Sequence, residues 1–502
     1  MAVVVVLCIA LFFIAALYLL QQSLRPNKYP PGPAWLPIVG NVFYVKALLK
    51  EHGFQHSAFG YLDKIYRTNI LGLKLGQDLT VVVSSIELIR EVLTREEFEG
   101  RPVSFFFKLR TMGRRQGITC TDGKLWHEQR SFAVRHLRKV GYGKESMEQA
   151  IQTELSELVL TLDQEERVRL GPEFAKSVLN VLWMFVAGNR LTQSCSYINK
   201  LLYLMDKRKQ VFDMSGGKLS QMPWLRFVAP DFSGYSLITE INTALEDFFK
   251  EIIEKHEQTH SCRNIRDFID AYLHQMHDEE EGELKKSFTV DQLIVVCLDF
   301  FIAGSQTTSN TLDFAFLLVL LHPDIQKKVR EEICSVVGTE RRATLSDRTN
   351  MPYVEAVLME TQRLCTIVPL IGPRRVLKDT TLGSYNIPKD TVILANAFSV
   401  HMDEDHWKDP YVFRPERFLD ENGAVRADEW FMPFGLGRRR CLGDALARSC
   451  IFLFFTGVLQ HFEVLPDDDK ALPSIQPLAG ITMSPQSYCV RLARIHDKSR
   501  GA

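Results

Sequence analysis

The sequence has few of the features that mark small secreted domains or nucleic-acid-binding proteins. Its ten cysteines are scattered over 502 residues without a CxxC pair, which argues against a disulfide framework or a zinc module and favours a reducing compartment. Lys and Arg number 60 and Asp and Glu number 61, a formal net charge of -1. Because no basic excess exists to neutralise a phosphate backbone, we expect no nucleic-acid partner. An apolar fraction of 46% is still enough for a large core.

Motifs for several common cofactors are also missing. The sequence has no GxxxxGK[ST] phosphate loop and no HExxH zinc motif. Gly141-Tyr142-Gly143 lacks the third glycine of a dinucleotide-binding turn. The chain therefore has no flavin or nicotinamide motif, and electrons for any redox chemistry must come from a partner.

The amino-terminal segment is the one long uncharged run. Residues 2–20 (AVVVVLCIALFFIAALYLL) form a stretch that, at about 1.5 Å per residue in a helix, nearly reaches across the roughly 30 Å bilayer core. A cleaved signal peptide is the alternative, but it would need a basic start and a small-residue cleavage site. Arg25 and Lys28 follow the run and no basic residue precedes it, which predicts a cytosolic carboxyl side.

Organisation along the chain follows from this anchor. Pro30-Pro31-Gly32-Pro33 cannot continue a helix and predicts a stiff connector. We expect a membrane anchor at 1–22, a Pro-rich hinge at 23–40 and one large domain at 41–502. Hydrophobic periodicity predicts a mainly α fold with small β-sheets. Helical patterns cover 145–165, 236–258, 289–321, 324–337, 351–366 and 441–460, strand-like pieces cover 67–74, 79–84, 374–383 and 391–396, and the polar run 277–286 predicts a solvated loop.

The segment 289–321 predicts a long buried helix. Thr289 with Gln292 resembles a capping box, and Pro323 ends the pattern. A second membrane span is the rival interpretation, but Asp299 and the polar run 304–310 would be costly against lipid. Buried polar groups need partners: Thr307 could simply bond the carbonyl four residues back, or it could face a ligand.

The segment 434–443 (FGLGRRRCLG) places a thiol before a predicted helix, after glycines and among three arginines. The helix dipole and the guanidinium charges both favour a thiolate at Cys441, which would be a nucleophile or a soft metal ligand. A buried structural cysteine in a glycine turn is the alternative. The pattern F-x-x-G-x-R-x-C-x-G resembles the cysteine loop of the haem-thiolate monooxygenases, the cytochrome P450 family. The resemblance implies that fold, haem b with Cys441 as axial ligand, and haem-contacting positions at Phe434, Gly437 and Gly443.

Further motifs follow in the order that the family has them. Glu360 and Arg363 resemble its E-x-x-R pair and Arg417 its P-E-R-F arginine, which implies an ion network behind the haem. Trp126 and Arg130 resemble its W-x-x-x-R motif. The resemblance implies that the haem propionates are bound by these two residues together with Arg101, Arg374 and Arg439. Arginine suits this role because its planar fork pairs with carboxylates.

One motif departs from the family. Residues 303–308 (AGSQTT) resemble its oxygen-activation motif A-G-x-[DE]-T-[TS], but Gln306 replaces the acid. An amide cannot titrate, so we expect Thr307 and water to deliver protons and Gln306 to orient them. Gly304 would leave backbone accessible to a ligand.

The resemblance also implies an activity, partners and a location. It implies insertion of one oxygen atom from O2 into an apolar molecule, with electrons from NADPH through a flavoprotein reductase, possible help from cytochrome b5, and attachment to the endoplasmic-reticulum membrane. Arg135, Arg138 and Lys139 could meet the reductase or could be ordinary surface charge. The two alternatives are a reductase-independent haem-thiolate isomerase or dehydratase and a non-catalytic haem-binding protein.

The substrate pocket implied by family position is apolar and rich in aromatic residues, which suits a hydrophobic or aromatic small molecule. The chain resembles insect microsomal members near the juvenile-hormone epoxidases. The resemblance suggests epoxidation of a sesquiterpenoid ester or conversion of phenylalanine to an oxime, and we leave both open here. The implied pocket residues are Phe105, Phe106, Phe107, Ile118, Phe301, Ala303, Val368, Ile371 and Ile481.

Overall fold

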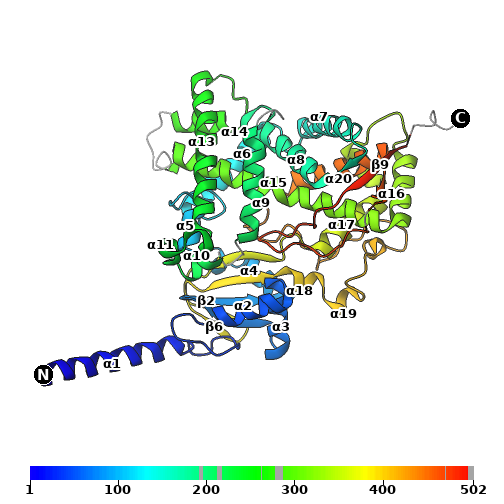
Figure 1. Ribbon diagram of the computed structural model, residues 1–502. Coiled ribbons are helices and arrows are strands. Elements are labelled where there is room, and N and C mark those ends of the chain that lie inside the picture. Colours follow the sequence, from blue (N-terminus) through cyan, green and yellow to red (C-terminus); the bar gives the residue numbers. More distant parts are fainter. Residues whose placement is uncertain (192–195, 212–216, 262, 278–286, 470, 496–502) are drawn as a thin grey trace.

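A mostly helical region and a smaller region built on a β-sheet make up the body of the protein (Figure 1). The computed structural model describes residues 1–191, 196–211, 217–261, 263–277, 287–469 and 471–495. Most of the polar run predicted as a loop, residues 278–286, therefore lies outside the described residues. The helices are α1 Ala2–Ser23, α2 Val42–His52, α3 Gln55–Tyr66, α4 Ile86–Thr94, α5 Phe105–Arg110, α6 Gly123–Lys139, α7 Glu145–Leu162, α8 Leu170–Ala187, α9 Ser196–Val211, α10 Gly217–Gln221, α11 Leu225–Val228, α12 Pro230–Ser233, α13 Tyr235–Thr259, α14 Phe268–His277, α15 Val290–Leu321, α16 Pro323–Val336, α17 Pro352–Cys365, α18 Ala397–His401, α19 Glu404–Trp407 and α20 Asp444–His461.

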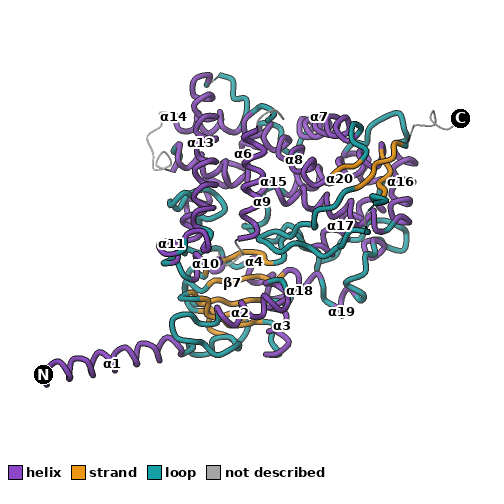
Figure 2. The backbone as a smooth tube through the Cα atoms, viewed as in Figure 1, coloured by secondary structure: helices purple, strands orange, loops and turns teal. Residues whose placement is uncertain are grey.

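The strands gather in two places (Figure 2). The larger sheet has the order β1-β2-β7-β4, in which β2 and β7 are parallel and the other pairs antiparallel. The parallel pair joins Thr80 to Val392, so two segments far apart in the sequence meet in one sheet. Apolar side chains of this sheet pack against α2 and α3. The strands are β1 Ile70–Leu75, β2 Asp78–Val83, β3 Arg167–Val168, β4 Leu370–Arg375, β5 Thr380–Leu382, β6 Tyr385–Ile387, β7 Val392–Asn396, β8 Phe462–Pro466 and β9 Val490–Arg494.

Two predicted strands differ from the structure. The strand expected at 67–74 begins only at Ile70, because Arg67 ends α3 in a left-handed conformation with φ 47°. The strand expected at 374–383 is divided, because β4 ends at Arg375 and the chain turns before β5 pairs with β6. Short, strongly turned segments do not carry enough alternation for periodicity to locate such breaks.

The long helix α15 lies at the centre of the helical region and packs against α8, α17 and α20. Thr289 caps it by accepting a hydrogen bond from the Gln292 backbone N–H at 3.1 Å. The reciprocal half of the expected capping box is absent, because the Gln292 side chain bonds both backbone groups of Gly117 instead. Most of the apolar part of α15 is buried within the protein, so it is a core helix of this fold.

The amino-terminal helix α1 extends away from the body (Figure 1). Its candidate membrane span Val3–Ser23 has a mean hydropathy of 3.2, and none of its apolar window is buried in the protein, whereas Gln22 near its end accepts from the Lys74 ammonium at 2.9 Å. The segment after it is not a free linker, because Arg25 donates to the carbonyls of Pro30 and Pro33 at 3.0 and 2.6 Å and Tyr29 packs edge-on against Trp35. These contacts hold residues 25–35, the segment that connects the anchor helix α1 to the body, against the protein.

Apolar side chains near α11 and α12 are a second lipid-facing candidate. Trp224, Phe227, Val228 and Phe232 are all more than half exposed. Such exposure of large apolar groups is costly in water and marks a contact surface.

Deletion of residues 2–20 is predicted to weaken membrane attachment without loss of the folded body, because the apolar window of α1 is not buried and Gln22, which accepts from the Lys74 ammonium, is kept. Residual attachment should remain and should fall further when Trp224 and Phe227 are also changed to Ser. Membrane flotation measures attachment, and circular dichroism and haem content measure whether the body stays folded. Loss of haem in the truncated protein would contradict this separation of anchor and body.

Candidate active site

The helix α15 and the loop 434–443 border an internal cavity of about 370 Å³. Apolar side chains of α8, α15 and the 366–371 segment form much of its wall, and arginines gather on one side. Cys441 lies in the lining and is accessible from this space. The cavity thus brings the two motifs that the sequence singled out, 303–308 and 434–443, to a single place.

The cysteine loop is shaped by two glycines and short backbone bonds. Gly435 and Gly437 have φ of 66° and 71°, which side-chain-bearing residues rarely adopt. The loop closes when the Cys441 N–H donates to the carbonyl of Phe434 at 2.9 Å, after which α20 begins at Asp444. Gly443 lies next to the thiol, since a Cβ there would be 3.8 Å from Sγ. The loop therefore directs Sγ into the cavity just before a helix N-terminus.

The electrostatic surroundings of Cys441 correct the sequence-based expectation. Burial raises the pKa of the Cys441 thiol, and a hydrogen bond from the Gly443 backbone together with the charges of Arg130 and Arg448 opposes that rise only in part. Two of the three consecutive arginines make contacts elsewhere: Arg438 pairs with Glu96 and Glu99 at 3.3 Å, and Arg439 lies over the Trp126 ring. A bound cation would be required to hold this cysteine as a thiolate.

Three arginines on one side of the cavity have unsatisfied donors. Arg101 Nε and the Nε and Nη1 atoms of both Arg374 and Arg439 are buried without a hydrogen-bond partner among the described residues. Burial and the repulsion from Arg101 lower the pKa of Arg439 to about 8, and the same two causes lower the pKa of Arg374 to about 9. Buried positive charge of this kind requires an anion. The two propionates of a haem supply such anions, so the donor set fits the expected cofactor.

Trp126 and Arg130 support the same wall in different ways. The guanidinium of Arg439 lies 3.8 Å from the centroid of the Trp126 ring, a cation–π contact that fixes its direction. Arg130 donates to the Arg440 carbonyl at 2.8 Å and so braces the cysteine loop. Both residues line the cavity, as the sequence-based assignment requires.

Behind the cavity, the fully buried Glu360 carboxylate joins three segments. Arg363 donates to it through Nε and Nη2 at 2.7 and 2.9 Å, and Arg417 Nε donates at 2.9 Å. Arg363 also donates to the carbonyls of His401 and Pro410 at 2.7 Å. The Nε2 atom of His401 accepts from the Met432 N–H at 3.2 Å. Burial lowers the pKa of His401 to about 3, so the ring is neutral and this acceptor is available.

On the opposite wall, α15 presents its polar turn. Thr307 lines the cavity and donates to the Ala303 carbonyl at 2.9 Å. This is the bond to the carbonyl four residues back that the sequence offered as the alternative to a ligand contact. Gln306 is half-buried and is not part of the lining. Gly304 lines the cavity, but a Cβ added there would lie 2.3 Å from Leu182 Cδ2, so its smallness serves the packing of α8 on α15.

The predicted pocket residues divide into two groups. Ile118, Ala303, Val368 and Ile371 line the cavity. The other five lie outside its lining: Phe105, Phe106, Phe107 and Ile481 pack with Leu219 and Ile238, and Phe301 packs with Trp183, Phe248 and Phe249.

The position of each residue around the axis of α15 explains why Phe301 lies outside the cavity lining. Phe300, its neighbour on α15, lines the cavity in its place. Helical periodicity counted back from Thr307 could have found Phe300, because seven residues are about two turns. Leu182 and Val178 of α8 also line the cavity, and nothing in the sequence marked them.

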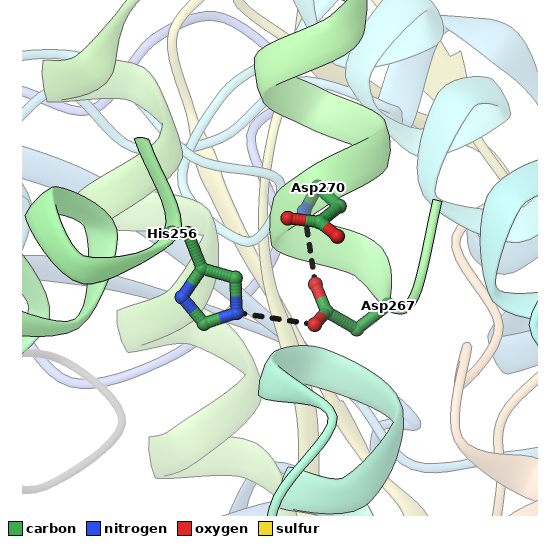
Figure 3. A group of neighbouring side chains, drawn as sticks. All are labelled: His256, Asp267 and Asp270. Atoms are coloured by element: carbon green, nitrogen blue, oxygen red, sulfur yellow. Dashed lines mark hydrogen bonds and ion pairs between the residues drawn. The ribbon is translucent and has the colours of Figure 1, made fainter. Parts of the chain in front are cut away.

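A separate cluster of potential metal ligands, His256, Asp267 and Asp270, is drawn in Figure 3. Its atoms are occupied by one another and by Arg266: His256 Nε2 lies 3.1 Å from Asp267, Asp267 accepts from the Asp270 N–H, and Arg266 donates twice to Asp270. None of the four residues lines the cavity. The cluster connects the end of α13 to the start of α14 and is structural.

Comparison with known proteins agrees with this geometry. Residues 30–492 match the family model of Cytochrome P450. The chain is 45% identical to "Probable cytochrome P450 305a1" of Drosophila melanogaster, over 98% of this chain and 100% of that one. It is 39% identical to "Farnesoate epoxidase" of Bombyx mori over 97% of each chain, and 36% identical to "Cytochrome P450 2J2" of Homo sapiens over 95% of this chain and 93% of that one.

Substitution of Gly437 by Ala is predicted to disrupt the cysteine loop far more than the same change at Gly435. Both glycines have positive φ, which costs an alanine about 1–2 kcal/mol. Only at Gly437 would the methyl group lie 2.0 Å from a backbone atom, the Leu93 carbonyl oxygen; at Gly435 the nearest atom is 3.8 Å away. Haem content per protein and urea unfolding measure the effect. Equal losses in the two variants would contradict the role given to close packing against α4.

Proposed function

Because the chain belongs to the cytochrome P450 family, and is thus a monooxygenase that uses haem-thiolate iron, O2 and NADPH-derived electrons delivered by a reductase, we propose that it epoxidises a sesquiterpenoid. The observation that carries this proposal is the match to "Farnesoate epoxidase" of Bombyx mori along nearly the whole of both chains. The apolar wall of the cavity is compatible with a terpenoid chain.

The residues of this chain divide the work of binding the cofactor. Cys441 would hold the iron from the floor of the cavity, and Arg101, Arg374 and Arg439 would bind the propionates with the donors that are otherwise unsatisfied. When bound, the haem supplies the activation of O2 that transfers one oxygen atom to the substrate. Phe434, Gly437 and Gly443 belong to the loop that positions the Cys441 Sγ atom at the cavity.

The opposite wall would position the substrate and supply protons. Phe300, Ala303, Val368 and Ile371 line the cavity with apolar groups, which would exclude water from a bound substrate and leave room for an apolar chain. Thr307 Oγ1 can rotate from the Ala303 carbonyl to a water in the cavity and pass a proton to the reacting centre. Gln306 has no proton to pass at neutral pH and does not line the cavity, so it would act on water only indirectly.

Partners and location follow from the same family. We propose the endoplasmic-reticulum membrane as the site of attachment through α1, with the body on the cytosolic side. Arg135, Arg138 and Lys139 are exposed at the end of α6 and offer a basic surface to a reductase or to cytochrome b5. Such surfaces guide encounter between oppositely charged proteins.

The proposed function is tested with full-length protein, reductase and NADPH. A farnesane-type sesquiterpenoid should be converted to a product heavier by one oxygen atom, as mass spectrometry would establish, and NMR of the product should place that oxygen in an epoxide ring. Omission of NADPH or reductase should abolish product. Product formed without NADPH would instead support an isomerase or dehydratase, and turnover of phenylalanine alone would overturn the terpenoid assignment.

The proton-delivery roles are tested in the same assay as product formed per NADPH consumed. Thr307→Ala should lower this ratio several-fold and release peroxide, whereas Gln306→Ala should lower it little. Gln306→Glu, which introduces the residue type of the family motif, is the matched control for charge at that position. A larger loss in Gln306→Ala than in Thr307→Ala would reverse the assignment.

A further inference from the structure

The backbone of Met432 sets the start of the cysteine loop. Its carbonyl accepts from the Gly435 N–H at 3.1 Å, which forms the first turn of the loop, and the Cys441 N–H then donates to the Phe434 carbonyl. Met432 is only 3% exposed and belongs to no helix or strand, so its own N–H needs a partner inside the protein. The His401 ring supplies that partner, because its Nε2 atom accepts from this N–H at 3.2 Å. The conformation of the loop therefore depends on a histidine 31 positions earlier in the chain.

The bond from Met432 determines where the His401 ring carries its proton. Nε2 accepts a hydrogen bond, so a neutral ring has its proton on Nδ1. Nδ1 lies 2.9 Å from Thr366 Oγ1 and therefore donates to it, and the Thr366 hydroxyl in turn donates to the Arg363 carbonyl at 2.5 Å. His401 is fully buried and Thr366 is 2% exposed, so water does not compete for these bonds. The three hydrogen bonds form one continuous series from the cysteine loop to α17.

Thr366, the middle member of the series, has an unusual backbone conformation. It follows the last residue of α17 with φ 36° and ψ 69°, in the left-handed region that β-branched residues rarely adopt. Such outliers persist where the surrounding structure imposes them and often mark a functional constraint. A glycine would adopt this conformation more easily, but it would have no hydroxyl to connect the Arg363 carbonyl with the His401 ring. The hydroxyl is therefore the feature that explains a threonine at this position.

Arg363 joins this series of hydrogen bonds to the buried ion network. Its guanidinium is paired with Glu360 and also donates to the His401 carbonyl at 2.7 Å. The side chain of Arg363 thus holds the backbone of His401, while the side chain of His401, through Thr366, holds the backbone of Arg363. This reciprocal arrangement fixes both the position and the angle of the imidazole ring. His401, Thr366 and Met432 all line the cavity, so the series is part of its wall.

We propose that His401, oriented by Thr366, is a positioning residue that keeps the cysteine loop in the conformation in which Cys441 can bind the haem iron. It acts through the Met432 peptide and is not itself a ligand. The loop is sensitive to this contact because it contains two glycines with positive φ, whose backbone is free to adopt other conformations once the Met432 peptide is released. The inference requires that Cys441 is the iron ligand, and it does not depend on which substrate is oxidised.

The test uses purified full-length holoenzyme, reduced and bound to carbon monoxide. The ratio of haem with the red-shifted Soret band of thiolate ligation to haem without it is compared at one urea concentration, at which the parent contains both forms and circular dichroism shows intact helices. Thr366→Val keeps the size and branching of the side chain but leaves the His401 Nδ1–H without an acceptor. The loss of one hydrogen bond should lower the ratio about fivefold. Thr366→Ser keeps the hydroxyl and should match the parent, and an equal loss in both variants would overturn the inference.

A second pair of variants separates the role of His401 from the general effect of losing a buried histidine. His401→Phe keeps a planar ring but removes both nitrogens, so the Met432 N–H loses its acceptor and the ratio should fall further than in Thr366→Val. His56 is the matched control, because it is 3% exposed, burial lowers its pKa to about 4, and its ring packs against the rings of two phenylalanines. His56→Phe should keep the ratio of the parent. Equal losses in His56→Phe and His401→Phe would contradict a specific role for His401.

Amide hydrogen exchange of the holoenzyme reports the proposed contact itself. The Met432 amide should exchange about tenfold faster in His401→Phe than in the parent, because its hydrogen-bond acceptor is gone. The Leu293 amide, which donates to the Thr289 carbonyl at 2.9 Å in the first turn of α15, should exchange at the same rate in both proteins. An unchanged rate at Met432 would show that His401 does not hold this peptide and would refute the inference.

The positioning role and the ligand assignment can fail separately. A ratio equal to that of the parent in both Thr366→Val and His401→Phe would refute the positioning role and leave Cys441 as the ligand. A parent without the red-shifted band would overturn the ligand assignment and this inference with it. Failure of the sesquiterpenoid proposal would change neither result, because these measurements contain no substrate.

Discussion

The buried carboxylate of Glu360 is the interaction on which the site geometry depends. It accepts from Arg363, Arg417 and the Arg414 backbone, and Arg363 in turn holds the carbonyls of residues 401 and 410. This network fastens the irregular segment before the cysteine loop to α17. Removal of one partner from such a buried pair typically costs about 3–5 kcal/mol, because the remaining charge is left unpaired. His401 extends the constraint to Met432, two residues before the loop begins.

With the loop held from behind, the cavity acquires two chemically different sides. One side carries the arginines whose donors lack partners, and the other carries apolar side chains with one polar turn of α15. The first side fits the anionic edge of a haem, and the second fits an apolar substrate with few groups to direct it.

The elements that form the site could be predicted from the sequence wherever one sequence pattern corresponds to a single helix or loop. The long apolar period of 289–321 and the closely spaced loop motif each correspond to one element, and the structure brings them together at the cavity. The side on which a residue faces was harder to predict. Phe301 and Phe300 differ by one helical position, and Phe301 is the one that packs into the core against Trp183, Phe248 and Phe249.

Long-range contacts account for the other differences. Gln292 fits a capping box locally, yet its side chain bonds Gly117, which is distant in sequence. Arg438 and Arg439 precede Cys441 closely in sequence, yet their side chains lie against Glu96, Glu99 and Trp126. Arg110 belongs to no motif, and only the fold reveals that it pairs with Asp299 of α15.

The central claim is that Cys441 provides the thiolate that holds the haem iron at the floor of the cavity. The most direct measurement is the absorbance spectrum of the reduced, carbon-monoxide-bound protein in the parent and in Cys441→Ser. The account predicts the red-shifted Soret band of thiolate ligation in the parent and its loss in the variant, because a serine hydroxyl does not replace a thiolate as iron ligand. The same red-shifted band in Cys441→Ser would contradict it.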